Sequence, residues 1–185
     1  MTFDQYSHII FDFDETLVTL KIHWSFWHQD IIPLIKKYET DFDPQTYLDM
    51  SFIHHYVEKY GPNFLKDFVE FEKKLEQDHY YGYIKIEKSL NLLEKLKQDD
   101  KQLYLLTSNC REVVEPILEE VQIKNYFKKI VTVNDVENLK PSAAPFKLIR
   151  EIEIAKENYL MIGDSKNDSG FAKQAGIAYL DVREF

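Results

Sequence analysis

The sequence predicts an α/β fold in which a parallel sheet is sandwiched by helices and interrupted by a small α-helical insertion. Short apolar runs end in small or polar residues, which is typical of buried strands. Helix-like segments lie between most of these runs, and this alternation indicates a parallel sheet with helices on both faces. Residues 21–83 break the alternation and are rich in aromatic residues, Lys and Glu.

The individual elements follow from these patterns. Strands are expected at residues 8–13, 102–109, 129–133 and 158–164, where the runs HIIFDF, QLYLLTSN, KIVTV and NYLMIGD lie. Helices are expected over 89–98, 111–121, 144–154 and 169–177, with Pro116 early enough in the second to be tolerated. In the insertion, Phe68, Phe71 and Leu75 have helical spacing and predict a helix over 68–77. The predicted organisation is a Rossmann-like core at 1–20 and 84–185, with a helical cap at 21–83.

Composition limits the classes of function. The chain has 185 residues, 44% of them hydrophobic, which is enough for a sizeable core. A net charge of -9 argues against broad binding to nucleic acid or to an anionic membrane. No apolar run approaches the roughly 18–20 residues that span a bilayer, and a single cysteine, Cys110, excludes an intramolecular disulfide. We therefore expect a cytoplasmic protein, a monomer or weak homodimer, with no nucleic-acid or membrane partner.

Polar residues follow each predicted strand, and ligands of open parallel sheets bind at the carboxyl ends of the strands. Asp12 and Asp14 follow the first strand, and the period of two predicts that they share one face and need a cation. Asp164 adds a carboxylate from a neighbouring strand end, and such hard oxygen ligands suit Mg²⁺. Lys140 supplies a positive charge, and Thr107 with nearby backbone N–H groups can bind phosphate. Together these groups meet the needs of aspartyl phosphoryl transfer.

The four segments FDFDETL, LLTSN, LKPS and GDSKND resemble, in order, the four motifs of the haloacid dehalogenase (HAD) superfamily. The resemblance covers about residues 5–20 and 84–180, and the insertion falls where many members carry a C1-type cap. The acid two residues after the first aspartate is absent from dehalogenase members, so DFDET favours phosphoryl chemistry. Glu15 stands where the family more usually has Gly.

The resemblance implies a role for each motif residue. Asp12 would be the nucleophile and also a metal ligand. Asp14 would be the general acid and then the base, with its backbone carbonyl facing the metal. Lys140 would neutralise charge between nucleophile and phosphate. Asp164 would bind Mg²⁺ directly, and Asp168 would support it through water or Lys140, although Asp168 could also simply cap the following helix. The phosphate-binding set would be Thr107, Ser108 and Asn109, with Thr16 supporting the turn.

The resemblance therefore implies a Mg²⁺-dependent phosphatase that hydrolyses a small phosphorylated metabolite. Two alternatives stay open: a phosphotransferase or mutase of the β-phosphoglucomutase type, and a regulatory module that binds Mg²⁺ or phosphate without turnover. Trp24 and Trp27 are expected to pack the cap helices, whereas Lys21 and His23 follow the catalytic loop closely enough to line its entrance. The sequence assigns no role to His28, and it does not identify the substrate.

Overall fold

The computed structural model describes residues 3–46, 48 and 50–185, without the side chains of Trp24, Met50, Ser51 and Gln77. The chain forms two compact units, an α/β unit made of Met1–Leu20 and Tyr83–Phe185 and a helical unit made of Lys21–Gly82. It leaves the α/β unit through β2 (Val18–Ile22) and returns through β3 (Tyr80–Lys85). These two strands pair with each other as a separate two-stranded sheet, which the sequence analysis did not predict.

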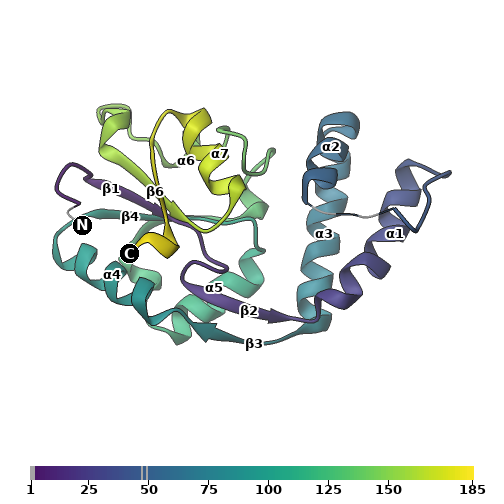
Figure 1. Ribbon diagram of the computed structural model, residues 1–185, viewed down its shortest axis with the longest axis horizontal. Coiled ribbons are helices and arrows are strands. Elements are labelled where there is room, and N and C mark those ends of the chain that lie inside the picture. The colour runs from purple at the N-terminus through teal and green to yellow at the C-terminus, as the bar shows by residue number, and fades with distance from the viewer. Residues whose placement is uncertain (1–2, 47, 49) are drawn as a thin grey trace. The chain divides into compact units, whose positions relative to one another are not determined.

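Five parallel strands form the main sheet, in the order β5-β4-β1-β6-β7 (Figure 1). The strands are β1 (His8–Phe11), β4 (Gln102–Leu106), β5 (Phe127–Val131), β6 (Tyr159–Gly163) and β7 (Ala178–Asp181). The strand β1 is central, and its Ile9 lies opposite Leu103 of β4 and Leu160 of β6. The predicted parallel α/β fold is confirmed, and β7 is a strand that the sequence analysis missed.

Helices cover both faces of this sheet. Figure 1 shows α6 (Phe146–Ile149) and α7 (Lys166–Ala175) on one face, and α4 (Glu87–Gln98) and α5 (Arg111–Glu120) on the other. Ile10, Met161 and Phe171 belong to the buried cluster under α6 and α7. Because side chains alternate along a strand, Ile9 and Phe11 point to the opposite face, and both are fully buried. Short 3-10 turns connect the elements at Lys124–Tyr126, Val133–Asp135, Lys156–Asn158 and Val182–Glu184.

The prediction of a helix over 144–154 is wrong in length, because α6 is shorter and ends at Ile149. The backbone N–H of Glu151 donates to the Tyr159 hydroxyl at 2.9 Å, so it does not continue the helix. The Glu151 carboxylate in turn accepts hydrogen bonds from Tyr104 and Lys128. These tertiary contacts outweigh the helical spacing of the apolar residues.

The helical unit contains a 3-10 turn (Trp24–Phe26), α1 (Trp27–Tyr38), α2 (Met50–Tyr60) and α3 (Pro62–His79). Pro62 is the first residue of α3, a position where its missing N–H costs no helical hydrogen bond. The Glu39 carboxylate accepts hydrogen bonds from Tyr56 and Tyr60 of α2, which ties the end of α1 to that helix. No helix of the described residues has the length and apolar character needed to cross a membrane.

Candidate active site

The predicted site residues follow the ends of neighbouring parallel strands. Asp12 comes directly after β1, Thr107 after β4 and Asp164 after β6. The Asp12 backbone N–H donates to the Ile162 carbonyl of β6 at 2.9 Å, which extends the pairing of the two strands into the site. Because the strands are parallel, these ends meet at one edge of the sheet.

Lys140 is the centre of a buried charge network at this edge. Its Nζ lies 2.7 Å from Asp12 Oδ1, 2.6 Å from Asp168 Oδ1 and 3.1 Å from the Leu106 carbonyl oxygen. Only 4% of Lys140 is exposed. Burial by itself lowers the pKa of Lys140, but the Asp12 and Asp168 carboxylates outweigh burial and hold that pKa above its usual value. Lys140 therefore stays charged and is the internal counter-ion of both aspartates.

Three aspartates form a carboxylate cluster around this lysine. Asp12, Asp164 and Asp168 each offer an oxygen, and these oxygens lie within 4.8 Å of one another. Burial raises the pKa of Asp12 to about 7, against the lowering effect of Lys140. Burial and the charge of Asp168 also raise the pKa of Asp164. One lysine thus compensates three acids incompletely, and their hard oxygen atoms are the donor set that Mg²⁺ prefers.

Asp168 has two structural contacts, one through each carboxylate oxygen. Its Oδ1 accepts from Lys140, while its Oδ2 accepts from the Ser165 backbone N–H at 3.1 Å and the Ser165 hydroxyl at 2.5 Å. In return, the Asp168 N–H donates to Ser165 Oγ at 3.2 Å, which completes a capping box at the start of α7. The predicted contact with Lys140 is present. The alternative that Asp168 is itself the N-cap is wrong, because Ser165 is the N-cap and Asp168 is the third residue of the helix, paired with Ser165 in the capping box.

Gly163 allows Asp168 to approach the end of β6. A Cβ atom at position 163 would lie 2.5 Å from Asp168 Cγ and 2.6 Å from its Oδ2. Asp168 is fully buried and held by Lys140 and Ser165, so it has little room to move away. The glycine is therefore part of the construction of the site.

Asp14 lies on a turn outside the carboxylate cluster. The prediction that Asp12 and Asp14 share a strand face is wrong, because β1 ends at Phe11 and both acids lie beyond it. Asp14 Oδ1 accepts from the Leu20 N–H at 2.7 Å and from the Glu15 N–H at 3.1 Å. Burial raises the pKa of Asp14 to about 6, although the Leu20 hydrogen bond lowers it. The side chain can thus hold or release a proton near neutral pH.

The turn after β1 has an unusual backbone at Glu15. Its φ is 54°, in the left-handed region that glycine adopts without strain. This explains physically why a glycine would suit the position that Glu15 occupies. Thr16, the next residue, is fully buried, and its hydroxyl has no hydrogen-bond partner among the described residues.

The loop after β4 is held by its own side chains. Thr107 is buried, and its hydroxyl donates to Asn109 Oδ1 at 2.7 Å while accepting from the Asn109 backbone N–H at 3.0 Å. Ser108 is half-buried between them. The threonine thus fixes the loop backbone, and its predicted role in phosphate binding stays a prediction.

Four residues that the sequence singled out, Lys21, His23, Trp27 and His28, have described surroundings in the helical unit. Trp27 is buried and donates from Nε1 to Glu72 at 2.8 Å, in agreement with a packing role. His28 contacts the Trp27 ring edge-on, with centroids 5.2 Å apart. His23 stacks on Tyr81 with centroids 4.4 Å apart, and Lys21 is half-buried. The Trp24 side chain lies outside the described part of the chain.

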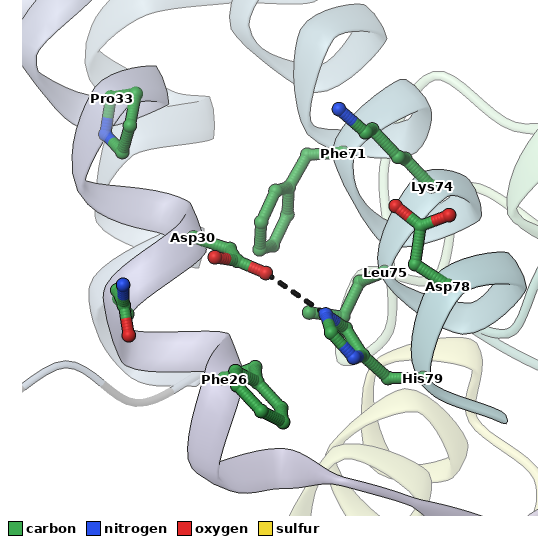
Figure 2. Close-up of a pocket in the computed structure, with 9 residues that line it drawn as sticks. Phe26, Asp30, Pro33, Phe71, Lys74, Leu75, Asp78 and His79 are labelled. Atoms are coloured by element: carbon green, nitrogen blue, oxygen red, sulfur yellow. Dashed lines mark hydrogen bonds and ion pairs between the residues drawn. The ribbon is translucent and has the colours of Figure 1, made fainter.

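A cleft that the sequence analysis did not predict lies within the helical unit, between α1 and α3 (Figure 2). Its volume is about 670 Å³. Figure 2 shows Asp30 of α1 pointing to His79 of α3, and the two side chains form a hydrogen bond of 3.1 Å. The Phe26 ring stacks on His79 with centroids 4.4 Å apart. The described residues that line the cleft are Phe26, Gln29, Asp30, Pro33, Phe71, Lys74, Leu75, Asp78 and His79.

The fold and the site define a Rossmann-like α/β protein whose acids and lysine meet at the carboxyl edge of a parallel sheet. The family model described as haloacid dehalogenase-like hydrolase matches residues 9–182. The chain belongs to this family, which confirms the resemblance drawn from the four motifs.

Curated relatives of the chain are phosphatases. It is 27% identical over 172 residues to pyrophosphatase PpaX of Bacillus cereus (strain B4264), a match that covers 91% of this chain and 79% of the relative. It is 35% identical over 106 residues to phosphoglycolate phosphatase of Escherichia coli (strain K12), covering 54% of this chain but only 42% of that enzyme. The prediction of a phosphatase-like HAD hydrolase is thus confirmed.

A solved structure supports the fold independently. A protein described as a haloacid dehalogenase-like hydrolase from Bacteroides fragilis superposes with a TM-score of 0.65 and 19% identity, covering 94% of this chain and 86% of that one. At this level of identity, the likeness establishes the shared fold.

Proposed function

We propose that the protein is a Mg²⁺-dependent phosphatase that hydrolyses a small phosphate monoester through an aspartyl-phosphate on Asp12. One observation carries the proposal: the Asp12 carboxylate lies in a buried site, held at 2.7 Å by Lys140, with Asp164 and Asp168 beside it. A phosphatase of this type needs a carboxyl group as nucleophile, a positive charge beside it and acids that can hold a divalent cation. The described residues supply all three.

In the first step, an Asp12 carboxylate oxygen attacks phosphorus, and the bond from phosphorus to the substrate oxygen breaks. The Asp14 carboxyl group gives its proton to that leaving oxygen. In the second step, Asp14 takes a proton from water as the water oxygen attacks phosphorus, and the phosphorus–Asp12 bond breaks. Inorganic phosphate leaves, and both acids return to their starting states. The raised pKa of Asp14, about 6, suits a group that alternates between acid and base.

The carboxylate cluster fits Mg²⁺ by its chemistry. Asp12 and Asp164 would bind the ion, together with the backbone carbonyl of Asp14, and Asp168 would support them through its hydrogen bond to Lys140. When bound, the ion would offset the negative charge shared by the nucleophile and the phosphate. Lys140 supplies the remaining positive charge from inside the protein.

The substrate's phosphate would be held by Thr107, Ser108 and Asn109 in the loop after β4. The Thr107 hydroxyl and the Asn109 N–H, which bond each other in the free protein, would turn to the phosphate when it binds. Thr16 would keep the turn that carries Asp14 in place. The helical unit would act as a cap that selects the substrate. A cytoplasmic setting is proposed because the sequence contains a single cysteine, Cys110, and so forms no intramolecular disulfide.

The test is phosphate release from an aryl phosphate, phosphorylated sugars and nucleotides, phosphoglycolate and inorganic pyrophosphate, each with Mg²⁺ and with EDTA. The last two compounds are included because of the names of the curated relatives. We expect release only with Mg²⁺, and a loss of at least about a thousandfold in Asp12→Asn. Asp99→Asn, an exposed acid at the end of α4, is the matched control and should retain wild-type activity.

Three results would contradict the proposal. Release that continues in Asp12→Asn would exclude the aspartyl-phosphate route. A folded chain that binds Mg²⁺ but releases phosphate from no compound would favour a regulatory module. Transfer of the phosphate to a second sugar hydroxyl, seen by ³¹P NMR, would instead identify a mutase.

A further inference from the structure

The loop that carries Asp164 is held from both of its ends. On the side of α7, Ser165 is fixed by the capping box with Asp168. On the side of β6, two side chains from the last strand and the turn after it contact its backbone. The Tyr179 hydroxyl donates to the Gly163 carbonyl oxygen at 3.0 Å, and Arg183 Nη2 donates to the Asp164 carbonyl oxygen at 2.9 Å.

Arg183 is itself oriented by Asp181. Its Nε lies 2.7 Å from Asp181 Oδ1, its Nη2 contacts Asp181 Oδ2, and its backbone N–H donates to Oδ1 at 2.9 Å. These hydrogen bonds lower the pKa of Asp181 to about 2, so the carboxylate is ionised at neutral pH. The guanidinium group thus spans two partners, the Asp181 carboxylate and the Asp164 carbonyl, which a single ammonium group cannot hold in the same geometry.

Tyr179 is a fixed donor to the same loop. Burial, with the nearby carboxylate of Asp181 adding to it, raises the pKa of Tyr179 to about 12, so its hydroxyl keeps its proton. Its partner, the Gly163 carbonyl, belongs to the residue directly before Asp164. The two donors therefore hold the carbonyl groups of two successive peptide units and limit backbone rotation about the Asp164 Cα atom between them.

We propose that Arg183, assisted by Tyr179, is a positioning residue that orients Asp164 for Mg²⁺. This inference rests on the proposed function, because it needs Asp164 to be a metal ligand. Arg183 touches no reacting atom and acts through the Asp164 backbone. Because 73% of its side chain is exposed, its ion pair adds little to the free energy of unfolding. Its effect on Mg²⁺ affinity is thus separable from an effect on folding.

The experiment measures binding of MgCl₂ alone to the full chain by isothermal titration calorimetry, without substrate. In Arg183→Met we expect the Mg²⁺ dissociation constant to rise about 10-fold, the low end of the effect of removing a group that orients a metal ligand. Tyr179→Phe, which removes only the hydroxyl, should raise it by a smaller factor. Arg150→Met changes an exposed arginine at the end of α6 and should leave it unchanged.

Two further measurements separate the possible outcomes. Urea unfolding in EDTA should give nearly the same midpoint for Arg183→Met and wild type. If Arg183 had a purely structural role, weaker Mg²⁺ binding would instead come with a lower unfolding midpoint. Asp164→Asn should abolish Mg²⁺ binding. If Asp164→Asn does so while Arg183→Met binds Mg²⁺ like wild type, this inference fails and the proposed metal site stands. If wild type binds no Mg²⁺, both fail.

Discussion

Replacing Lys140 with Met tests the buried charge network directly. Methionine keeps much of the apolar stem of lysine but removes its charge and its three hydrogen bonds, to Asp12, Asp168 and the Leu106 carbonyl. Two buried carboxylates and one buried carbonyl then lose their shared donor. The perturbation is thus electrostatic, with little change in volume.

The expected loss is large because the lysine and its partners are buried. Removing one member of a buried ion pair costs about 3–5 kcal/mol, since the remaining charge stays buried without compensation. Lys140 serves two carboxylates, of which Asp168 is fully buried and Asp12 is 7% exposed. We therefore expect Lys140→Met to lower the free energy of unfolding by about 3–5 kcal/mol.

The assay is urea unfolding at pH 7.5 in EDTA, so that no divalent cation offsets the lost charge. Lys147→Met, at an exposed lysine in α6, is the matched control and should change the free energy of unfolding by less than about 0.5 kcal/mol. Adding Asp168→Asn to Lys140→Met removes one of the uncompensated charges, so the double variant should lose less than the sum of the two single losses. A loss below about 1 kcal/mol in Lys140→Met would refute the buried network as described.

Three further substitutions have defined outcomes. Gly163→Ala should lower the free energy of unfolding by about 1–3 kcal/mol in urea unfolding, because its Cβ would overlap the buried Asp168 side chain; an unchanged midpoint would contradict this close approach. Glu15→Gly should raise the free energy of unfolding by about 0.5–1 kcal/mol, because glycine adopts a φ of 54° without strain. The thermal midpoint should therefore rise, and a lowered midpoint would contradict this explanation. Burial raises the pKa of Glu72 to about 7, above its unfolded value, so the folded state binds the extra proton and stability should fall on the order of 1–2 kcal/mol as pH rises from 4.5 to 7. Asp12 and Asp14 also have raised pKa values and contribute to the total fall, so Glu72→Gln should reduce that fall by this amount rather than abolish it. The substitution should also remove a fluorescence transition of the hydrogen-bonded Trp27, measured in a Trp24→Phe background; a transition that persists would contradict the assignment.

The sequence was sufficient to predict which residues meet in the site. Parallel strands bring their carboxyl ends to one edge, so Asp12, Lys140, Asp164 and Asp168 could be grouped without knowledge of any distance. The local geometry could not be predicted in the same way. A pattern of apolar residues does not show at which residue a strand ends. The strand β1 ends before Asp12, so the prediction that Asp12 and Asp14 share a strand face was wrong.

The missed elements have identifiable physical causes. The strand β7 has only four residues, and just one of its side chains is buried, so its apolar signal is short. In β2 (Val18–Ile22), buried and half-buried residues alternate with the period of a strand, and this signal was available in the sequence. Arg183 has a role only through a contact 19 residues away, with the Asp164 carbonyl, and no local pattern encodes such a contact.

The central position of β1 also has a consequence for how the chain is made on the ribosome. The strand is synthesised before the strands beside it, which begin at Gln102 and Tyr159. Its two edges therefore stay without their native partners until those later segments have been made, whereas the contacts of the helical unit need only residues 21–82. Long-range pairing of this kind slows folding and exposes apolar segments to aggregation. Nascent chains stalled before β6 are thus expected to be the form of this protein that chaperones bind.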